Sequence, residues 1–226
     1  MMTLLEKWFP HVVDKPAKFL ESIQETLVMT GWAGGLMLIF GLILGVLLIV
    51  TKKGGILECP VAFQILDKAV NLFRSIPFVI LIAFLMNITK AIMGTRIGIK
   101  GVIVPLVVGS VPFFSRQVES ALAGVNPGLI EAAKAMGVGP VGIIFRVYLR
   151  EGLAAIARGA TITLISLIGL TAMAGYVGAG GLGDYAITYG YNYNRMDIVW
   201  ASVIVIVIIV TVIQFIGTLI AKKATH

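Results

Sequence analysis

Residues 198–221 read IVWASVIVIVIIVTVIQFIGTLIA, and no Asp, Glu, Lys or Arg interrupts them. Residues 26–51 and 159–183 are equally free of charged side chains. Each of these three runs is longer than the ~20 residues that a helix needs to cross the hydrocarbon core of a bilayer. They therefore predict an all-α protein whose helices form a bundle in a membrane.

The composition of the whole chain supports a membrane protein. Hydrophobic residues make up 58% of the 226 positions and charged residues 13%, against about 45–50% and about 25% in soluble domains. The net charge of +7 would favour nucleic-acid binding in a soluble protein, but here the basic residues flank apolar runs, so we expect no nucleic acid as a partner. Cys59, His11 and His226 are too few to form a disulfide or a metal site.

Two shorter uncharged runs, 75–89 and 101–115, lie between basic residues whose long side chains can reach the membrane interface. Counting both gives five transmembrane helices in a single domain over residues 1–226. Lysine pairs follow the first and last spans, which by the positive-inside rule puts the C-terminus in the cytoplasm and the N-terminus outside. Residues 1–24 carry several charges and two prolines, and we interpret them as an interfacial arm.

The longest connection, residues 116–158, is too polar to span and too patterned to be a disordered loop. It predicts two short cytoplasmic helices. In the first, Asn126 suits the N-cap, Pro127 the first helical position and Gly137 a left-handed end. The second would begin near Pro140. A capped helix of this kind fits a groove on a partner protein, and an amphipathic helix lying on the inner leaflet is the alternative.

Residues 131–137 read EAAKAMG and are followed by Val147 and Leu149. This stretch resembles the EAA signature of the membrane subunits of ABC importers, E-A-A-x-x-x-G with I-x-L-P downstream. Arg150 stands where the family has proline. The resemblance implies that the loop is a coupling helix and that five of its residues contact the ATPase: Glu131, Ala132, Ala133, Met136 and Gly137.

Three further stretches are similar to the membrane subunit of methionine importers: FRSIPF at 73–78, ATITLI at 160–165 and GAGGLG at 178–183. The resemblance implies a methionine permease in the bacterial cytoplasmic membrane, formed as a homodimer. Its implied partners are ABC ATPase subunits at the cytoplasmic face and an external substrate-binding protein. ATP and Mg would bind to the ATPase, and this chain would hold no cofactor. A permease for another amino acid or small polar solute remains the alternative.

Six residues in and beside the spans are candidates to line a pathway whose wall is modestly polar as a whole, because such a wall lets a zwitterion pass without binding it tightly. They are Ser75, Pro77, Thr163, Ser166, Thr171 and Met173. Glycines near the outer mouth predict a tight turn that acts as an outer gate, with a plain external loop as the simpler interpretation. They are Gly178, Gly180, Gly181 and Gly183. The formal G-x-G-x-x-G match lacks the strand and helix that a dinucleotide site requires.

The sequence argues against an enzyme. It has no phosphate-binding loop of the G-x-x-x-x-G-K-[ST] type and no Ser/His/Asp set, so we expect no catalytic residue. Two alternatives of other classes stay open. A self-sufficient secondary transporter or channel would need buried acidic residues, which the three long runs lack. An assembly subunit without a pathway would show no flux at all.

Overall fold

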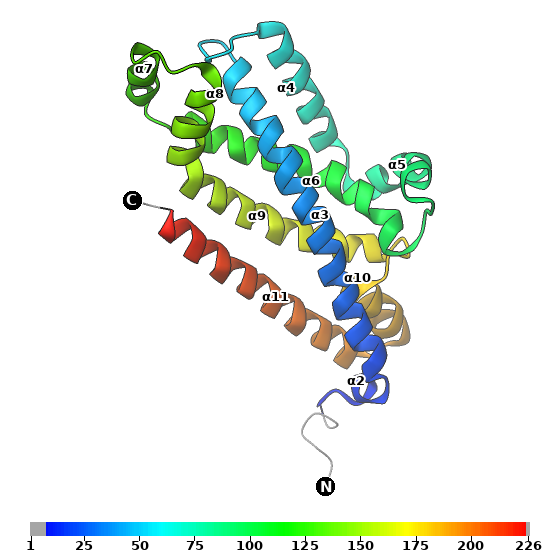
Figure 1. Ribbon diagram of the computed structural model, residues 1–226. Coiled ribbons are helices and arrows are strands. Elements are labelled where there is room, and N and C mark those ends of the chain that lie inside the picture. Colours follow the sequence, from blue (N-terminus) through cyan, green and yellow to red (C-terminus); the bar gives the residue numbers. More distant parts are fainter. Residues whose placement is uncertain (1–7, 225–226) are drawn as a thin grey trace. The chain divides into compact units, whose positions relative to one another are not determined.

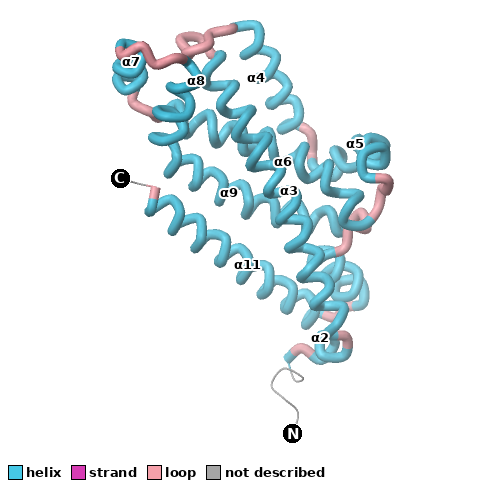
Figure 2. The backbone as a smooth tube through the Cα atoms, viewed as in Figure 1, coloured by secondary structure: helices cyan, strands magenta, loops and turns pink. Residues whose placement is uncertain are grey.

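The structure is a computed structural model that describes residues 8–224. Over that range the backbone is helical, with short loops and no strand (Figure 2). Four long helices, labelled in Figure 1, are α3 (Pro16–Thr51), α6 (Gly98–Ala123), α9 (Leu149–Gly175) and α11 (Met196–Lys223). The shorter α-helices are α2 (Pro10–Asp14), α4 (Pro60–Ser75), α5 (Phe78–Met93), α7 (Pro127–Ala135), α8 (Pro140–Ile143) and α10 (Gly181–Asp184). Two π-helical turns, η1 (Ile144–Tyr148) and η2 (Tyr185–Gly190), and one 3-10 turn, η3 (Tyr191–Tyr193), complete the elements of residues 8–224. The all-α prediction is confirmed.

Several of these helices are long and apolar enough to cross a membrane. Among the described residues, four segments qualify: Pro16–Thr51, Gly98–Ala123, Pro140–Gly175 and Met196–Lys223. The broken pair formed by α4 and α5 makes a fifth if it is counted as one span. The predicted polytopic bundle is therefore confirmed, with a helix count that agrees with five.

The second span is interrupted where the sequence places proline. Ile76 takes an extended conformation, with φ −83° and ψ 122°, because the ring of Pro77 disfavours a helical conformation in the residue before it. The helix that follows, α5, starts at Phe78 and has 16 residues. The predicted span at 75–89 is thus a short helix that is shifted toward the C-terminus.

The helices extend past the uncharged runs. The first long helix, α3, begins at Pro16, so the described end of the predicted arm is continuous with the first span, while residues 1–7 of that arm lie outside the described residues. At the 116–158 connection, α6 continues to Ala123 and α9 starts at Leu149. The uncharged run marks only the part of a helix in hydrocarbon, since charged side chains are tolerated where it reaches the interface.

The chain folds into two compact units. Among the described residues, unit 1 contains 8–35, Pro77–Val107 and Leu164–Ile213. Unit 2 contains Leu36–Ile76, Val108–Thr163 and 214–224. Each of the four long helices contributes residues to both units.

In unit 2, α3 and α6 pack closely through glycine. A Cβ atom placed on Gly45 would lie 2.5 Å from Cβ of Val118, and one on Gly41 would lie 2.6 Å from Cδ1 of Phe114. Both α6 side chains are fully buried. Without side chains of their own, the two glycines let the helix backbones approach, which is a common form of packing in membrane bundles.

In unit 1, the N-terminal helices pack against the region after α9. The rings of Phe19 and Tyr185 lie 5.5 Å apart, centroid to centroid. The backbone N–H of His11 donates to Oδ2 of Asp197 at 3.0 Å, and its Nδ1 lies 3.0 Å from Oδ1. These contacts hold α2 and the start of α3 against η2 and the start of α11.

Candidate coupling helix, pathway residues and glycine turn

Helix α7 has both ends fixed by its own sequence. The Gly128 N–H donates to Oδ1 of Asn126 at 2.9 Å, and Pro127 occupies the first helical position. At the other end Gly137 has φ +75°. There the Gly137 N–H donates to the Lys134 carbonyl and the Val138 N–H to the Ala133 carbonyl, both at 3.0 Å. This pair of bonds is the Schellman motif, and the predicted capped helix is confirmed.

Most of the α7 surface is uncovered by the rest of the chain. Ala133 is its one buried residue. Met136, the C-cap, is 75% exposed and Leu129 is 44% exposed, so an apolar side chain lies open at each end of the helix. Glu131 and Ala132 are exposed as well. Of the five residues that the resemblance assigns to coupling, only Ala133 is used to attach the helix to the chain.

The segment after α7 anchors the loop. As predicted, a helical turn starts at Pro140, and it continues through η1 into α9. Ile143 and Tyr148 are buried, which fixes this segment against its own unit. Arg150, at the position of the family's proline, is exposed within α9. Arginine keeps its backbone N–H, so the helix continues through this position without a break.

The pathway candidates fall into two groups. The hydroxyls of Thr163 and Thr171 are buried and donate to carbonyls of their own helix, those of Gly159 at 2.7 Å and Ile168 at 2.8 Å. Ser166 and Met173 are seven residues apart on α9 and are exposed. Seven residues are close to two helical turns, so these two side chains share a face that other parts of the chain leave open.

The other two pathway candidates lie at the break before α5. The Ser75 hydroxyl donates to the Asn71 carbonyl at 2.8 Å. Pro77 forms the N-cap of α5. Both residues are exposed, so they are accessible at the break.

The glycines at 178–183 form a tight turn held by remote residues. Gly178, Gly180 and Gly181 all have positive φ. The Gly181 N–H donates to Oε2 of Glu25 at 2.6 Å, and the Leu182 N–H donates to Oγ1 of Thr26 at 2.8 Å. The predicted turn is present, and its role as an outer gate stays a prediction.

Sequence reasoning missed the residues that hold this turn. Glu25 and Thr26 lie 156 positions before their partners, and no local pattern links them. One signal was available: an acidic and a hydroxyl residue stand together at the edge of a long apolar run, where a spanning helix has few other polar partners.

A second missed feature is a polar cluster in unit 2. The guanidinium of Arg116 on α6 pairs with the carboxylate of Asp67 on α4, donates to Oδ1 of Asn71 at 3.0 Å and to Oε2 of Glu119 at 2.6 Å. Spacing was a usable signal, since Asp67 and Asn71 are four residues apart and share a helix face. The cluster ties α4 to α6. Among residues 8–224 no group of three or more His, Cys, Asp or Glu side chains is arranged to hold a metal ion.

Comparison with known proteins identifies a family. Residues 41–226 match the family described as binding-protein-dependent transport system inner membrane component. The chain is 42% identical to the probable D-methionine transport system permease protein MetI of Vibrio cholerae, over 98% of this chain and 97% of that one. It is 43% identical to the methionine import system permease protein MetP of Bacillus subtilis, over 97% and 98% of the two chains.

Solved structures give the same result. A chain of the inward-facing MetNI methionine ABC transporter matches with a TM-score of 0.90 and 40% identity, and the match covers 100% of both chains. A chain of an amino acid ABC transporter crystallised with histidines matches with a TM-score of 0.77 at 15% identity. At that identity the second match supports the fold alone.

Proposed function

This chain belongs to the family of binding-protein-dependent transport system inner membrane components, and from that premise we propose that it is the permease subunit of an ATP-driven methionine importer. The single observation that carries the mechanism is α7, an exposed helix with fixed ends that bears the EAA-type motif. The relatives named as methionine permeases support the substrate. The chain is a multi-pass membrane protein and a transport subunit.

In our proposal α7 docks into a groove on a cytoplasmic ATPase. Exposed Met136, Leu129 and Ala132 supply apolar contact, and Glu131 supplies a charge that fixes register. Because the caps are built from the loop's own residues, the helix is already formed before binding, and docking orders little additional backbone. The buried anchors at Ala133, Ile143 and Tyr148 give α7 a firm attachment through which movement of the ATPase reaches α9.

The partners follow from the same proposal. ATP and Mg bind to the ATPase subunits, and this chain contributes no residue to hydrolysis. Two copies of the chain pack around a twofold axis to form the pathway, and an external substrate-binding protein delivers methionine, as the D or L isomer. The match to a chain of the MetNI methionine ABC transporter supports this assembly.

The orientation is part of the proposal. Lys52 and Lys53 follow α3, and Lys222 and Lys223 end α11. By the positive-inside rule these ends face the cytoplasm of a bacterial cytoplasmic membrane, and the N-terminus faces outward. The exposed α9 face with Ser166 and Met173 lines the pathway, while the Gly178–Gly183 turn forms the outer gate.

Coupling is tested by charge reversal on α7. The chain, its ATPase and its binding protein are reconstituted in liposomes, and we measure methionine uptake and the ATPase rate with binding protein present. Glu131→Arg is expected to lower both by about tenfold or more, since it places a wrong charge in the docking surface. Gly137→Val should act similarly, because a β-branched residue is disfavoured at positive φ. Asp14→Arg, an exposed acidic position on α2, is the matched control.

Wild-type uptake and stimulation in both variants would overturn the docking role. Methionine flux through the purified chain without ATPase would instead favour a self-sufficient transporter. Competition by other amino acids in the same assay measures substrate choice.

Orientation is tested by labelling. Cys59 is the single cysteine of the sequence and is exposed, so Ala132→Cys in a Cys59→Ser background carries one reactive thiol. A membrane-impermeant maleimide should label it in inverted vesicles and leave it unlabelled in intact cells. Labelling from the outside of intact cells would contradict the proposed topology.

A further inference from the structure

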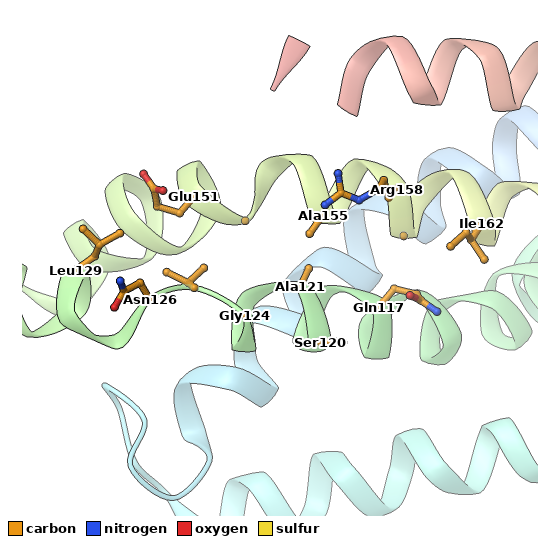
Figure 3. Close-up of a pocket in the computed structure, with 13 residues that line it drawn as sticks. Gln117, Ser120, Ala121, Gly124, Asn126, Leu129, Glu151, Ala155, Arg158 and Ile162 are labelled. Carbon is orange, nitrogen blue, oxygen red and sulfur yellow. The ribbon is translucent and has the colours of Figure 1, made fainter. Parts of the chain in front are cut away.

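Unit 2 contains an open cavity of about 520 Å³ between α6, the start of α7 and α9. Its volume lies in the range of small-molecule sites, roughly 300–1,000 Å³. Figure 3 shows the two helices that form its long walls, with Gln117 and Ala121 on α6 and Ala155, Arg158 and Ile162 on α9. Neither the coupling helix nor the pathway candidates explain this cavity.

Along the cavity α6 and α9 approach each other closely at glycine residues. A Cβ atom on Gly152 would lie 2.7 Å from Cδ2 of Leu122, and one on Gly159 would lie 2.8 Å from Cβ of Gln117. On the neighbouring face the side chains are short, as at Ala121 and Ala155, and do not fill the space between the helices. Close glycine contacts and short side chains thus occur together along the hollow.

Two opposite charges line this hollow without a partner. Glu151 and Arg158 lie seven residues apart on α9, roughly 10 Å along its axis, and on the same face. Neither side chain forms a hydrogen bond or salt bridge within residues 8–224. Figure 3 shows the Arg158 side chain running along α9 beside Ala155. Arg116, in the same unit, has its guanidinium occupied by Asp67 and Glu119.

The rest of the lining is mixed. Val125, Leu129 and Ile162 offer apolar surface, while Gln117 and Asn126 offer amides. A purely cationic ligand would be repelled by the guanidinium of Arg158, and a purely anionic ligand would be repelled by the carboxylate of Glu151. A ligand with one charge of each sign and an apolar portion complements the cationic, the anionic and the apolar residues that line the cavity.

We propose that this cavity is a binding subsite for the transported zwitterionic amino acid on its way out of the pathway. Arg158 would pair with the α-carboxylate, because a guanidinium matches that group in a bidentate geometry. Glu151 would pair with the ammonium group, and the apolar side chain would lie against Leu129 and Ile162. The proposal rests on the proposed function and adds a site to it.

The position of the cavity links substrate to coupling. Asn126 caps α7 and Leu129 lies in its first turn, and both line the cavity. A bound amino acid would therefore touch the base of the helix that docks on the ATPase. Release of the substrate and movement of α7 would then both involve residues of this one cavity.

The test uses the complete transporter, reconstituted with its ATPase in nanodiscs, and a diazirine analogue of methionine as the photoprobe. After irradiation, labelled peptides are mapped by mass spectrometry. We expect label within residues 117–129 and 151–162, removed by excess methionine. Arg158→Gln and Glu151→Gln should each reduce this label about tenfold, the effect of losing one charged hydrogen bond. Arg150→Gln, an exposed arginine on the same helix that does not line the cavity, should leave it unchanged.

Methionine uptake by the same preparations separates this inference from the proposed function. Uptake with no competed label in either segment would overturn the subsite and leave the permease intact. Equal loss of label in the Arg150→Gln control would also overturn it, since the effect would then not depend on the cavity. Absence of methionine uptake by the wild type would count against the proposed function itself. Arg158→Lys, which keeps the charge and loses the planar fork, should retain part of the label.

Discussion

Helix α7 and the glycine turn at 178–183 are both short segments with fixed geometry, but they are fixed in different ways. The caps of α7 come from Asn126 and Gly137, inside its own loop. The turn is fixed by Glu25 and Thr26, which lie 156 positions away. The first segment can form whenever its loop is made, while the second requires α3 to be packed beside it. The difference predicts local effects of mutation at α7 and wider effects at the turn.

The largest loss of stability should come from a substitution at Gly183, which lies against the backbone of Ala172. A Cβ atom on Gly183 would lie 2.3 Å from the Ala172 carbonyl oxygen and 2.5 Å from its Cα. These are main-chain atoms that cannot rotate away, so Gly183→Ala should destabilise the fold by about 3 kcal/mol or more. The measurement is the thermal unfolding midpoint of the purified chain in detergent.

Gly178→Ala is the matched control for that variant. Gly178 has φ +79° and nothing within 4 Å of its Cβ position. The substitution should therefore lower stability only through the strain of a left-handed backbone conformation, by about 1–2 kcal/mol. Equal losses in the two variants would show that the close approach to Ala172 does not matter.

A smaller effect is expected at the remote cap. Glu25→Ala removes the charged acceptor of the buried Gly181 N–H, which should cost about 2 kcal/mol. Hydrogen exchange over residues 178–190 should accelerate, and α7 should keep its protection. Glu21→Ala is the control, since this exposed carboxylate forms a surface ion pair with Lys18 and its loss should cost ~0.5 kcal/mol or less.

The local cap should give a smaller and confined effect. Asn126→Ala should cost about 1 kcal/mol and accelerate exchange over residues 127–135, with no change at the glycine turn. Asn126→Ser keeps an acceptor and should behave like the wild type. Faster exchange at residues 178–183 in the alanine variant would contradict the view that α7 is specified by its own loop.

The smallest effect is expected at the aromatic contact beside the turn. The hydroxyl of Tyr185 is buried without a hydrogen-bond partner among the described residues, and burial raises the pKa of this phenol. The folded state thus favours the neutral form. Stability should fall as the pH rises above the unfolded pKa of about 10, because the unfolded chain ionises first.

Tyr185→Phe should remove most of this pH dependence. At neutral pH it should change stability by about 1 kcal/mol or less, in the stabilising direction, because an unsatisfied buried group is removed. The check is the unfolding midpoint between pH 7 and pH 11, with Tyr191→Phe, an exposed ring, as the control. A marked loss of stability in Tyr185→Phe at pH 7 would show that the hydroxyl has a partner in the protein.

Much of the fold could be predicted from the sequence, since a bilayer restricts a chain to few solutions. The apolar runs gave the number and type of spans, and Asn126, Pro127 and Gly137 gave both ends of α7. The helix ends near Pro16, Ala123 and Leu149 could not be predicted from the uncharged runs. Such a run marks the part of a helix that lies in the hydrocarbon of the bilayer, whereas backbone hydrogen bonding decides where the helix ends. The roles of Ser75, Pro77, Thr163 and the other pathway candidates stay predictions.

By itself the sequence determined that this protein is a bundle of membrane helices with one capped loop helix, because hydrophobic run length and local capping depend on neighbours in the chain. Tertiary structure alone decided that Glu25 and Thr26 hold the glycine turn, that Arg116 is neutralised by Asp67 and Glu119, and that Arg158 faces an open cavity with Glu151. The partner of a charge depends on which helices pack together. That packing is set by small residues such as Gly45 and Gly159, whose contacts lie far away in sequence.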